Sequence, residues 1–356
     1  MASDSGDRQT LRKTRGPVHA TLRDVARLAG VSVKTVSRVV NNQVDIAAPT
    51  RERVRTALKT LAYKPNFLAR SLIHQRSDTL AVVAWGMDYY GPSRTVVGIE
   101  QQAHELGYSL FLNLVGQPTD DNRDHILDSL IAHRVDGIIW AVPEVGNNRE
   151  WLTSEDLEQL PPTVFLFNEP RPGVATVIVD NRDGGRQATQ HLLDQGRRKI
   201  GILTGPMPAW EARERYAGWQ DVLGQAGQSP SLVVEGEWSA ESGERGMRQL
   251  FEQAPDLDAV FASSDQIALG ALGTATRLGR RVPQDLAIVG YDNIPEAAFF
   301  IPPLTTVYQQ LNLMGRTAVQ TLFTMIEARQ RGEPLEETPL KVITPELIVR
   351  ASSLAG

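Results

Sequence analysis

Hydrophobic residues follow two different patterns along the chain. Near the start, Leu22, Val25, Ala26 and Ala29 recur at positions i, i+3, i+4 and i+7, which is the spacing of one apolar face of a short α-helix. From about Thr79 onward, short continuous apolar runs rich in β-branched residues are separated by longer segments with helical spacing. Alternation of strands and helices predicts parallel sheets built from βαβ units. We therefore expect a small all-α unit followed by a larger α/β unit.

The small unit begins with a polar helix-start signal. Thr21 followed by Asp24 is typical of a capping box, in which a hydroxyl and a carboxylate each accept a hydrogen bond from an N–H at the helix start. Gly30 ends this helix, and Ser32 caps a second one whose valines face inward. Four residues share its outward face: Val33, Lys34, Ser37 and Arg38. This arrangement is typical of a helix-turn-helix, and the alternative is a helical hairpin whose basic face is only solvated.

Charge separates the two units further. The chain of 356 residues has a net charge of −5, yet residues 1–78 contain 15 Lys and Arg against 6 Asp and Glu, so the acidic residues gather in the remainder. A basic head on an acidic body concentrates attraction for phosphate at one end of the molecule. The chain has no cysteine, which excludes disulfides and thiolate metal sites. Together with a polar start unlike a secretion signal, this predicts a cytoplasmic protein.

Composition and apolar periodicity divide the chain into segments. A third helix is predicted from about Ala48 to Ala62, and a break at Pro65 follows it. The expected domains are a disordered tail at 1–18, the headpiece at 19–64, a hinge helix and linker at 65–78, and a body at 79–356. The body is expected to form two lobes, one from about 79–179 and 309–338, the other from about 180–308 and 339–356. Ligands of such sheets bind beyond the carboxyl ends of the strands, which places a site between the lobes.

Signatures of catalysis are absent from the sequence. It contains no H-E-x-x-H, no G-x-S-x-G, no Walker loop and no G-x-G-x-x-G, and its six histidines lack metal-ligand spacing. We therefore expect no enzymatic activity, no cofactor and no metal.

The segment ATLRDVARLAGVSVKTVSRVVNN, residues 20–42, closely resembles the DNA-binding headpiece of the lactose-repressor (LacI/GalR) family. The body resembles the periplasmic-binding-protein fold of the same family, in blocks that follow the family's order. These blocks are VDNRDGGRQAT (179–189), GILTGP (201–206), RYAGW (215–219), SSDQIALGAL (263–272), VGYDN (289–293) and IPPLTTV (301–307). The resemblance implies a homodimer that binds double-stranded operator DNA, with a small-molecule effector in the cleft.

The resemblance also implies which residues contact DNA. In the headpiece these are Thr21, Ser32, Val33, Lys34, Thr35, Ser37, Arg38 and Asn41, and in the hinge Ala69, Arg70 and Leu72. Arg38 and Lys34 are suited to guanine acceptors and Val33 to a thymine methyl group. Leu72 corresponds to the apolar residue that the family wedges into the minor groove.

Seven residues are implied in effector binding: Tyr90, Ser93, Asn168, Arg215, Trp238, Ser264 and Asp292. Arg215, Asp292 and Trp238 match family positions and together favour a sugar over a purine. Ser264 stands where the family's eponymous member has Asn, and Phe167, followed by Asn168, where it has Asp. The ligand therefore need not be a galactoside. Asp265 is expected either to cap its helix or to contact the ligand.

Three hypotheses remain open from the sequence. The first is a repressor of carbohydrate-utilisation genes that a mono- or disaccharide releases from a pseudo-palindromic operator. The second keeps the scaffold but makes the ligand a corepressor, or the protein an activator. The third is a sugar-binding protein in which the head is incidental. No stretch approaches the length of a membrane span, and no membrane partner is expected.

Overall fold

The computed structural model describes residues 20–40, 45–63, 76–120, 122–334 and 337–354. The chain divides into two units, Met1–Gln75 and Arg76–Gly356, and each is described by itself. No helix within the described ranges combines the length and the apolar content needed to cross a membrane.

The first unit is a helical headpiece built around a small apolar core. Its helices are α1 (Leu22–Ala29), α2 (Val33–Val40) and α3 (Ala48–Thr60). The expected capping box is present, because the Thr21 hydroxyl accepts from the N–H of Asp24 and the Asp24 carboxylate accepts from the N–H of Thr21. Gly30 adopts a left-handed φ of 64°, which lets the chain turn sharply into α2. One valine from each helix, Val25, Val36 and Val54, is fully buried at the centre.

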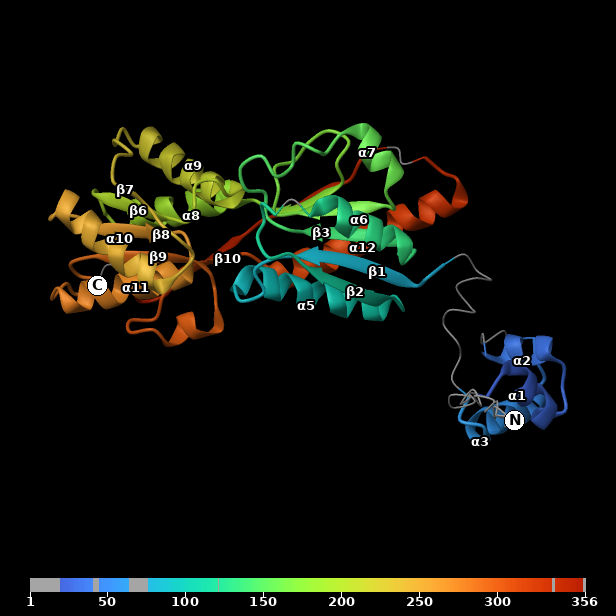
Figure 1. Ribbon diagram of the computed structural model, residues 1–356. Coiled ribbons are helices and arrows are strands. Elements are labelled where there is room, and N and C mark those ends of the chain that lie inside the picture. The colour runs from blue at the N-terminus through green and yellow to red at the C-terminus, as the bar shows by residue number, and fades with distance from the viewer. Residues whose placement is uncertain (1–19, 41–44, 64–75, 121, 335–336, 355–356) are drawn as a thin grey trace, which may run out of the picture. The chain divides into compact units, whose positions relative to one another are not determined.

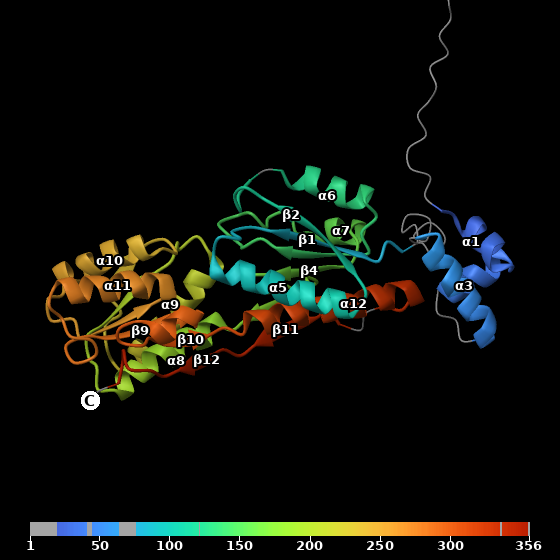
Figure 2. The ribbon, with the colours of Figure 1, turned by 90° about the horizontal axis from the view of Figure 1, so that it is seen from below.

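The second unit consists of two lobes, each a twisted sheet between helices (Figure 1). The first lobe contains β1 (Thr79–Ala84), α5 (Tyr90–Glu105), β2 (Ser109–Leu114), α6 (Arg123–Ala132), β3 (Gly137–Ala141), α7 (Ser154–Gln159), β4 (Thr163–Leu166), β5 (Thr176–Val179), α12 (Leu311–Arg331) and β11 (Leu340–Ile343). Its described strands run in the order β11-β5-β4-β3-β1-β2 and are all parallel. Helices α5 and α12 lie side by side on one face (Figure 2), and α6 packs on the other.

The second lobe repeats this plan. It contains α8 (Asn181–Asp194), β6 (Ile200–Thr204), α9 (Trp210–Gln225), β7 (Val233–Glu235), α10 (Ala240–Gln253), β8 (Ala259–Ala262), α11 (Asp265–Arg277), β9 (Ala287–Asp292), a 3₁₀ turn (Pro295–Phe299), β10 (Thr305–Tyr308) and β12 (Glu346–Ile348). The described strands follow the order β12-β10-β9-β8-β6-β7, and β12 is antiparallel to β10. Parallel strands covered on both faces are apolar throughout, which explains the continuous runs in the sequence.

Helices α8 and α9 approach each other through glycines. A Cβ on Gly185 would lie 2.3 Å from the carbonyl oxygen of Arg215, and one on Gly218 would lie 2.1 Å from that of Arg182. Only glycine permits this distance. The close contact sets the start of α8 beside the middle of α9. These two segments carry Asn181 and Arg215, which are hydrogen-bonded to each other, and Arg215 lines the cleft described below.

The chain passes between the lobes three times, after β5, after β10 and after β11. The first two crossings fall where the sequence indicates. The third does not, because 340–343 was assigned to the second lobe whereas β11 pairs with β5 at the edge of the first sheet. The apolar pattern of a strand shows that it is buried but not in which sheet, so the boundary at 339 moves to 344–345.

Candidate functional site

Helix α2 presents the face that the sequence predicts for DNA. Val36 is fully buried and Val39 nearly so, which holds one side of the helix against the headpiece core. On the other side of the helix Lys34 is exposed. Val33 is also exposed, by 41%, although its side chain is apolar. An exposed valine beside a lysine at the start of a helix is an arrangement suited to contact with base edges.

Hydroxyl groups organise the start of α2. The Ser32 hydroxyl accepts a hydrogen bond from the N–H of Thr35 at 3.1 Å and lies 2.9 Å from the Thr35 hydroxyl. The first turn of a helix also carries unpaired N–H groups and the positive end of the dipole. Ser32 and Thr35 therefore lie where a phosphate oxygen is bound most readily.

Arg38 forms an ion pair with Asp45, the first described residue after the end of α2. Both side chains are substantially exposed, at 40% and 54%. An exposed pair of this kind contributes little net stability, so it is readily exchanged for a contact with DNA. Asn41, Ala69, Arg70 and Leu72 lie outside the described residues, and their predicted roles stay predictions.

A cavity of about 650 Å³ lies between the two lobes of the body. The first lobe contributes aromatic side chains, among them Trp85, Tyr89, Tyr90 and Phe167, and the second contributes Trp238. Polar and charged side chains also line it: Asp88, Gln117, Glu211, Arg215, Glu237, Ser239, Ser264, Gln266, Asp292 and Gln309. Aromatic walls with a few convergent polar groups are typical of a small-molecule site.

Arg215 is the buried cation of this cleft, only 6% exposed. Its guanidinium donates to the Asn181 side-chain oxygen at 2.9 Å, to the Ser263 carbonyl at 2.6 Å and to the Gln309 side-chain oxygen at 3.3 Å. It also lies 3.8 Å from the centroid of the Tyr291 ring and 5.3 Å from that of Trp238. Each of the three guanidinium nitrogens thus donates one hydrogen bond to the protein, and the Tyr291 ring lies close to the group.

Asp292 ends β9 in a strained conformation. Its φ of 118° is rarely adopted by a residue with a side chain, and its carboxylate accepts a hydrogen bond from Gln309. Neighbouring Asp265 is fully buried and accepts from the Thr306 hydroxyl and the Ile294 N–H. Burial raises the pKa of both carboxyls, and the charge of Asp292 raises that of Asp265 further. The two groups therefore share less than two negative charges near neutral pH.

Two predicted residues do not line the cavity. The Ser93 hydroxyl donates to the backbone carbonyls of Tyr89 and Tyr90, so it stabilises the first turn of α5. Asn168 is fully buried and donates to the carbonyl of Glu169, whereas the preceding residue, Phe167, lines the cavity. The expectation for Asp265 was also wrong on one point, because Ser264 caps α11 and Asp265 buttresses the loop after β9.

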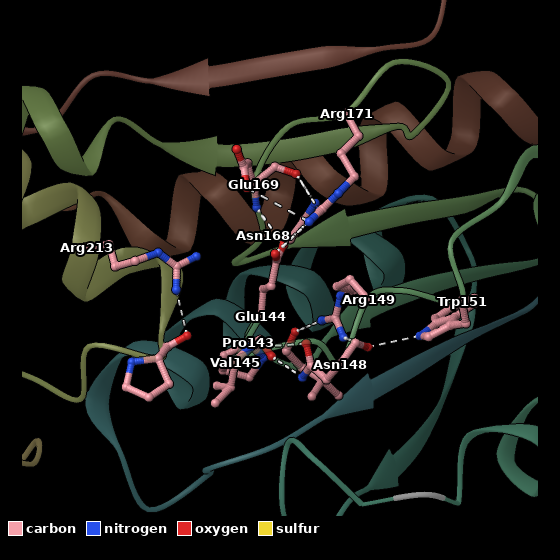
Figure 3. A network of polar contacts seen from close by, with 12 residues as sticks. Pro143, Glu144, Val145, Asn148, Arg149, Trp151, Asn168, Glu169, Arg171 and Arg213 are labelled. Atoms are coloured by element: carbon pink, nitrogen blue, oxygen red, sulfur yellow. Dashed lines mark hydrogen bonds and ion pairs between the residues drawn. The ribbon is translucent and has the colours of Figure 1, made fainter.

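The lobes are joined by backbone hydrogen bonds at one side of the cavity. The N–H of Trp210 donates to the carbonyl of Glu144 at 3.1 Å, and the N–H of Gly146 donates to the carbonyl of Pro208 at 3.1 Å. Figure 3 shows the side-chain network behind this contact, with the Arg171 guanidinium pointing at the Glu144 carboxylate. Both nitrogen–oxygen distances of that pair are short, at 2.8 and 2.6 Å. Burial alone would raise the pKa of Glu144, but the hydrogen bonds from Arg171 and the Glu169 N–H outweigh it and lower the pKa.

Comparison with known proteins agrees with both units. Residues 21–66 match the family model of bacterial regulatory proteins, lacI family, and residues 189–353 match a periplasmic-binding-protein-like domain. The transcriptional repressor PurR of Haemophilus influenzae (strain PittEE) is 35% identical over 94% of this chain and 98% of its own. The lactose operon repressor of Escherichia coli K12 is 33% identical over 94% of this chain and 91% of its own.

This chain belongs to the lacI family. Among solved structures, the lac repressor dimer bound to operator and the anti-inducer ONPF superimposes with a TM-score of 0.83, at 32% identity, over 95% of this chain and all of that one. A complex of the regulator CelR with cellobiose gives 0.68 at 33% identity, over 94% of this chain and all of that one. The protein is a DNA-binding transcriptional repressor of the family and not an enzyme, as the sequence predicts.

Sequence reasoning missed several polar residues of the cleft. Glu211 and Gln309 line the cavity, and the side-chain oxygens of Asn181 and Gln309 accept hydrogen bonds from Arg215. Glu211 lies four residues before Arg215 on α9, so helical periodicity places both on one face and supplies a signal that was available. Asn181 and Gln309 lie at lobe crossings, and nothing in the sequence pattern brings them to α9.

Proposed function

We propose that this repressor is a homodimer released from a pseudo-palindromic operator by a sugar bound between its lobes. The observation that carries the proposal is the cavity of about 650 Å³, which combines aromatic walls with carboxylates. Aromatic faces pack against the apolar faces of a sugar ring, while carboxylates accept hydrogen bonds from its hydroxyls. Two similar structures hold glycosidic ligands, one of them CelR with cellobiose and the other the lac repressor with ONPG.

Specific recognition of DNA is assigned to the outward face of α2. In this proposal Arg38 binds the O6 and N7 atoms of a guanine, Lys34 reaches a guanine acceptor and Val33 contacts a thymine methyl group. Hydroxyls of Ser32, Thr35 and Ser37 bind phosphates. A dimer places its two α2 helices about 34–36 Å apart in successive major grooves, which requires a two-fold symmetric operator.

Residues 65–78 are assigned as the hinge between headpiece and body, with Leu72 inserted in the minor groove. Effector binding couples to this hinge only through different affinities for two states of the body. A sugar held by Trp238 and Asp292 on one lobe and Tyr90 on the other favours the closed cleft. Closure moves the first lobes of the dimer apart, weakens pairing of the hinges and lowers operator affinity, with a coupling of about 1–3 kcal/mol.

A purine-type effector is the second candidate, because the relatives at 35% identity are named PurR. The same cleft also stabilises the DNA-binding state if the ligand favours it, which would make the ligand a corepressor. Both alternatives keep the same fold. The first differs from the proposed function in the chemistry of the ligand, and the second in whether the ligand weakens or strengthens operator binding.

Fluorescence anisotropy tests these possibilities together. The full chain is titrated onto DNA from its own upstream region at fixed salt, with lactose, cellobiose, maltose, glucose, adenine and guanine added in turn. We expect tight binding that one sugar abolishes. Tighter binding in the presence of a ligand would replace induction by corepression, and a response to a nucleobase alone would replace the sugar. A complex indifferent to every compound would overturn the sugar proposal.

A further inference from the structure

Among the described residues that line it, the effector cleft carries more carboxylates than cations. In the described part of the chain its lining includes four carboxylates, from Asp88, Glu211, Glu237 and Asp292, and one guanidinium, that of Arg215. That guanidinium already donates to three acceptors of the protein. A ligand that carries its own negative charge would meet more carboxylates than cations, whereas a ligand rich in O–H groups would find acceptors.

Glu211 differs from the other three carboxylates. Asp88 and Glu237 are exposed and remain hydrated, and Asp292 accepts a hydrogen bond from Gln309. Glu211 is only 9% exposed, and no other described residue donates a hydrogen bond to its carboxylate or forms an ion pair with it. Its only hydrogen bond comes from its own backbone N–H at the start of α9. Glu211 is not among the residues whose polar side-chain atoms are fully enclosed without a partner, and it lines the cavity, so its carboxylate is open to a ligand hydroxyl there.

Neighbouring charges act on the pKa of Glu211 together with its burial. Two guanidinium groups lie near enough to attract it, Arg215 one turn along α9 and Arg149 from the first lobe, while Glu144 repels it. Burial outweighs these charges and raises the pKa of Glu211 to about 7. Hydrogen bonds from a ligand would favour the ionised form, because donors stabilise a carboxylate more than a carboxylic acid.

We propose that Glu211 is the specificity-determining residue of the effector cleft, where it accepts hydrogen bonds from hydroxyls of an uncharged sugar and excludes ligands that carry phosphate or carboxylate there. This inference rests on the proposed sugar-induced function and deepens it by naming the ligand class. Glu211 also adjoins Trp210, whose N–H joins the lobes, so a sugar on Glu211 lies beside the interlobe contact.

Isothermal titration calorimetry of the full chain tests the role of Glu211. The probes are lactose, cellobiose and maltose, each compared with the uronic acid made by oxidising its terminal primary alcohol. Glu211→Gln keeps the shape and removes the charge, and Glu237→Gln is the matched control, since it removes an exposed carboxylate of the same cavity. Thermal unfolding and operator binding without ligand establish that both variants fold.

For the neutral sugar that binds the wild-type chain, we expect Glu211→Gln to weaken binding about 10- to 100-fold, because a hydrogen bond to a charged group is lost. Glu237→Gln should change it less than threefold. The preference for the neutral sugar over its uronic acid should fall at least tenfold in Glu211→Gln, an effect that a purely structural role would not produce.

Two results would overturn the inference, and they are distinguishable. If a sugar binds the wild-type chain and Glu211→Gln binds it with equal affinity and equal selectivity, Glu211 has no such role while the proposed function stands. If no sugar of the panel binds the wild-type chain although operator binding is intact, the proposed function and the inference fail together.

Discussion

The backbone N–H of Trp210 donates a 3.1 Å hydrogen bond to the carbonyl of Glu144, so the start of α9 in the second lobe is fixed to the first lobe. The Glu144 side chain is itself held by Arg171 in a two-bond ion pair. The position of α9, which carries both Glu211 and Arg215, therefore depends on a charge pair in the opposite lobe.

Breaking this pair should destabilise the body. Arg171→Met leaves Glu144, whose side chain is 5% exposed, buried without its partner, and we expect a loss of roughly 3 kcal/mol in the free energy of unfolding. The control is Arg316→Met, which removes an exposed pair with Glu105 and should cost below about 1 kcal/mol. Chemical denaturation measures both. Equal losses in the two variants would show that Glu144 tolerates the missing partner.

Replacement of Arg215 by lysine should produce a repressor that no longer responds to its effector. One ammonium group cannot reach the three acceptors that the guanidinium holds, although the charge is kept. We expect effector affinity to fall about 100-fold, with operator affinity in the absence of ligand unchanged. Calorimetry and anisotropy measure these two quantities. Arg213→Lys on the same helix is the control, since one nitrogen of Arg213 makes both of its hydrogen bonds, to the neighbouring carbonyls of Met207 and Pro208, which an ammonium group can reproduce. A matching loss there would contradict the assignment.

Arg38→Ala should weaken binding to one base pair of the operator by roughly 1–3 kcal/mol and relax specificity there. Asp45→Asn should act in the opposite direction, because it frees Arg38 from its ion pair and removes a negative charge from the headpiece. Anisotropy against operators altered at single positions measures both effects. Uniform weakening across all operators by Arg38→Ala would identify Arg38 as a phosphate contact instead.

The titration of Glu211 should make stability depend on pH. Its pKa in the folded protein lies near 7 rather than 4.5, so the folded state binds the proton more tightly. Below pH 4.5 the carboxyl is protonated in both the folded and the unfolded state, so it does not change the free energy of unfolding. As pH rises from 4.5 to about 7 it lowers the free energy of unfolding progressively, by up to roughly 3 kcal/mol. The charged groups that act on the Glu211 carboxyl are Arg215, Arg149 and Glu144.

Melting temperatures of wild type and Glu211→Gln should diverge between pH 4.5 and pH 7, with the variant more stable at high pH. Parallel curves would show that water solvates Glu211.

The sequence predicts local structure well because its signals are local. Thr21 and Asp24 form the expected cap, and the apolar runs from 79 onward are strands. It predicts Arg215, Trp238 and Asp292 in the cleft through resemblance to the family. The sequence does not predict features that depend on tertiary packing, such as the sheet that a strand joins or which side chain lines the cavity. β11 pairs with β5 of the first sheet, and Asn168 is buried whereas Phe167 lines the cavity. Neither result can be deduced from the local pattern of apolar residues.

The three crossings between lobes have a consequence for synthesis on the ribosome. The second lobe is continuous from 181 to 308 apart from β12, so most of it is available to fold before residues 309–356 emerge. The first lobe begins earlier in the chain but stays incomplete, since α12 covers its core and β11 forms its edge. The first lobe therefore gains a helix of its core only late in synthesis, whereas the second lobe by then lacks only the segment that contains its edge strand β12. Until α12 emerges, the apolar sheet face of the first lobe remains exposed to chaperones and to misfolding.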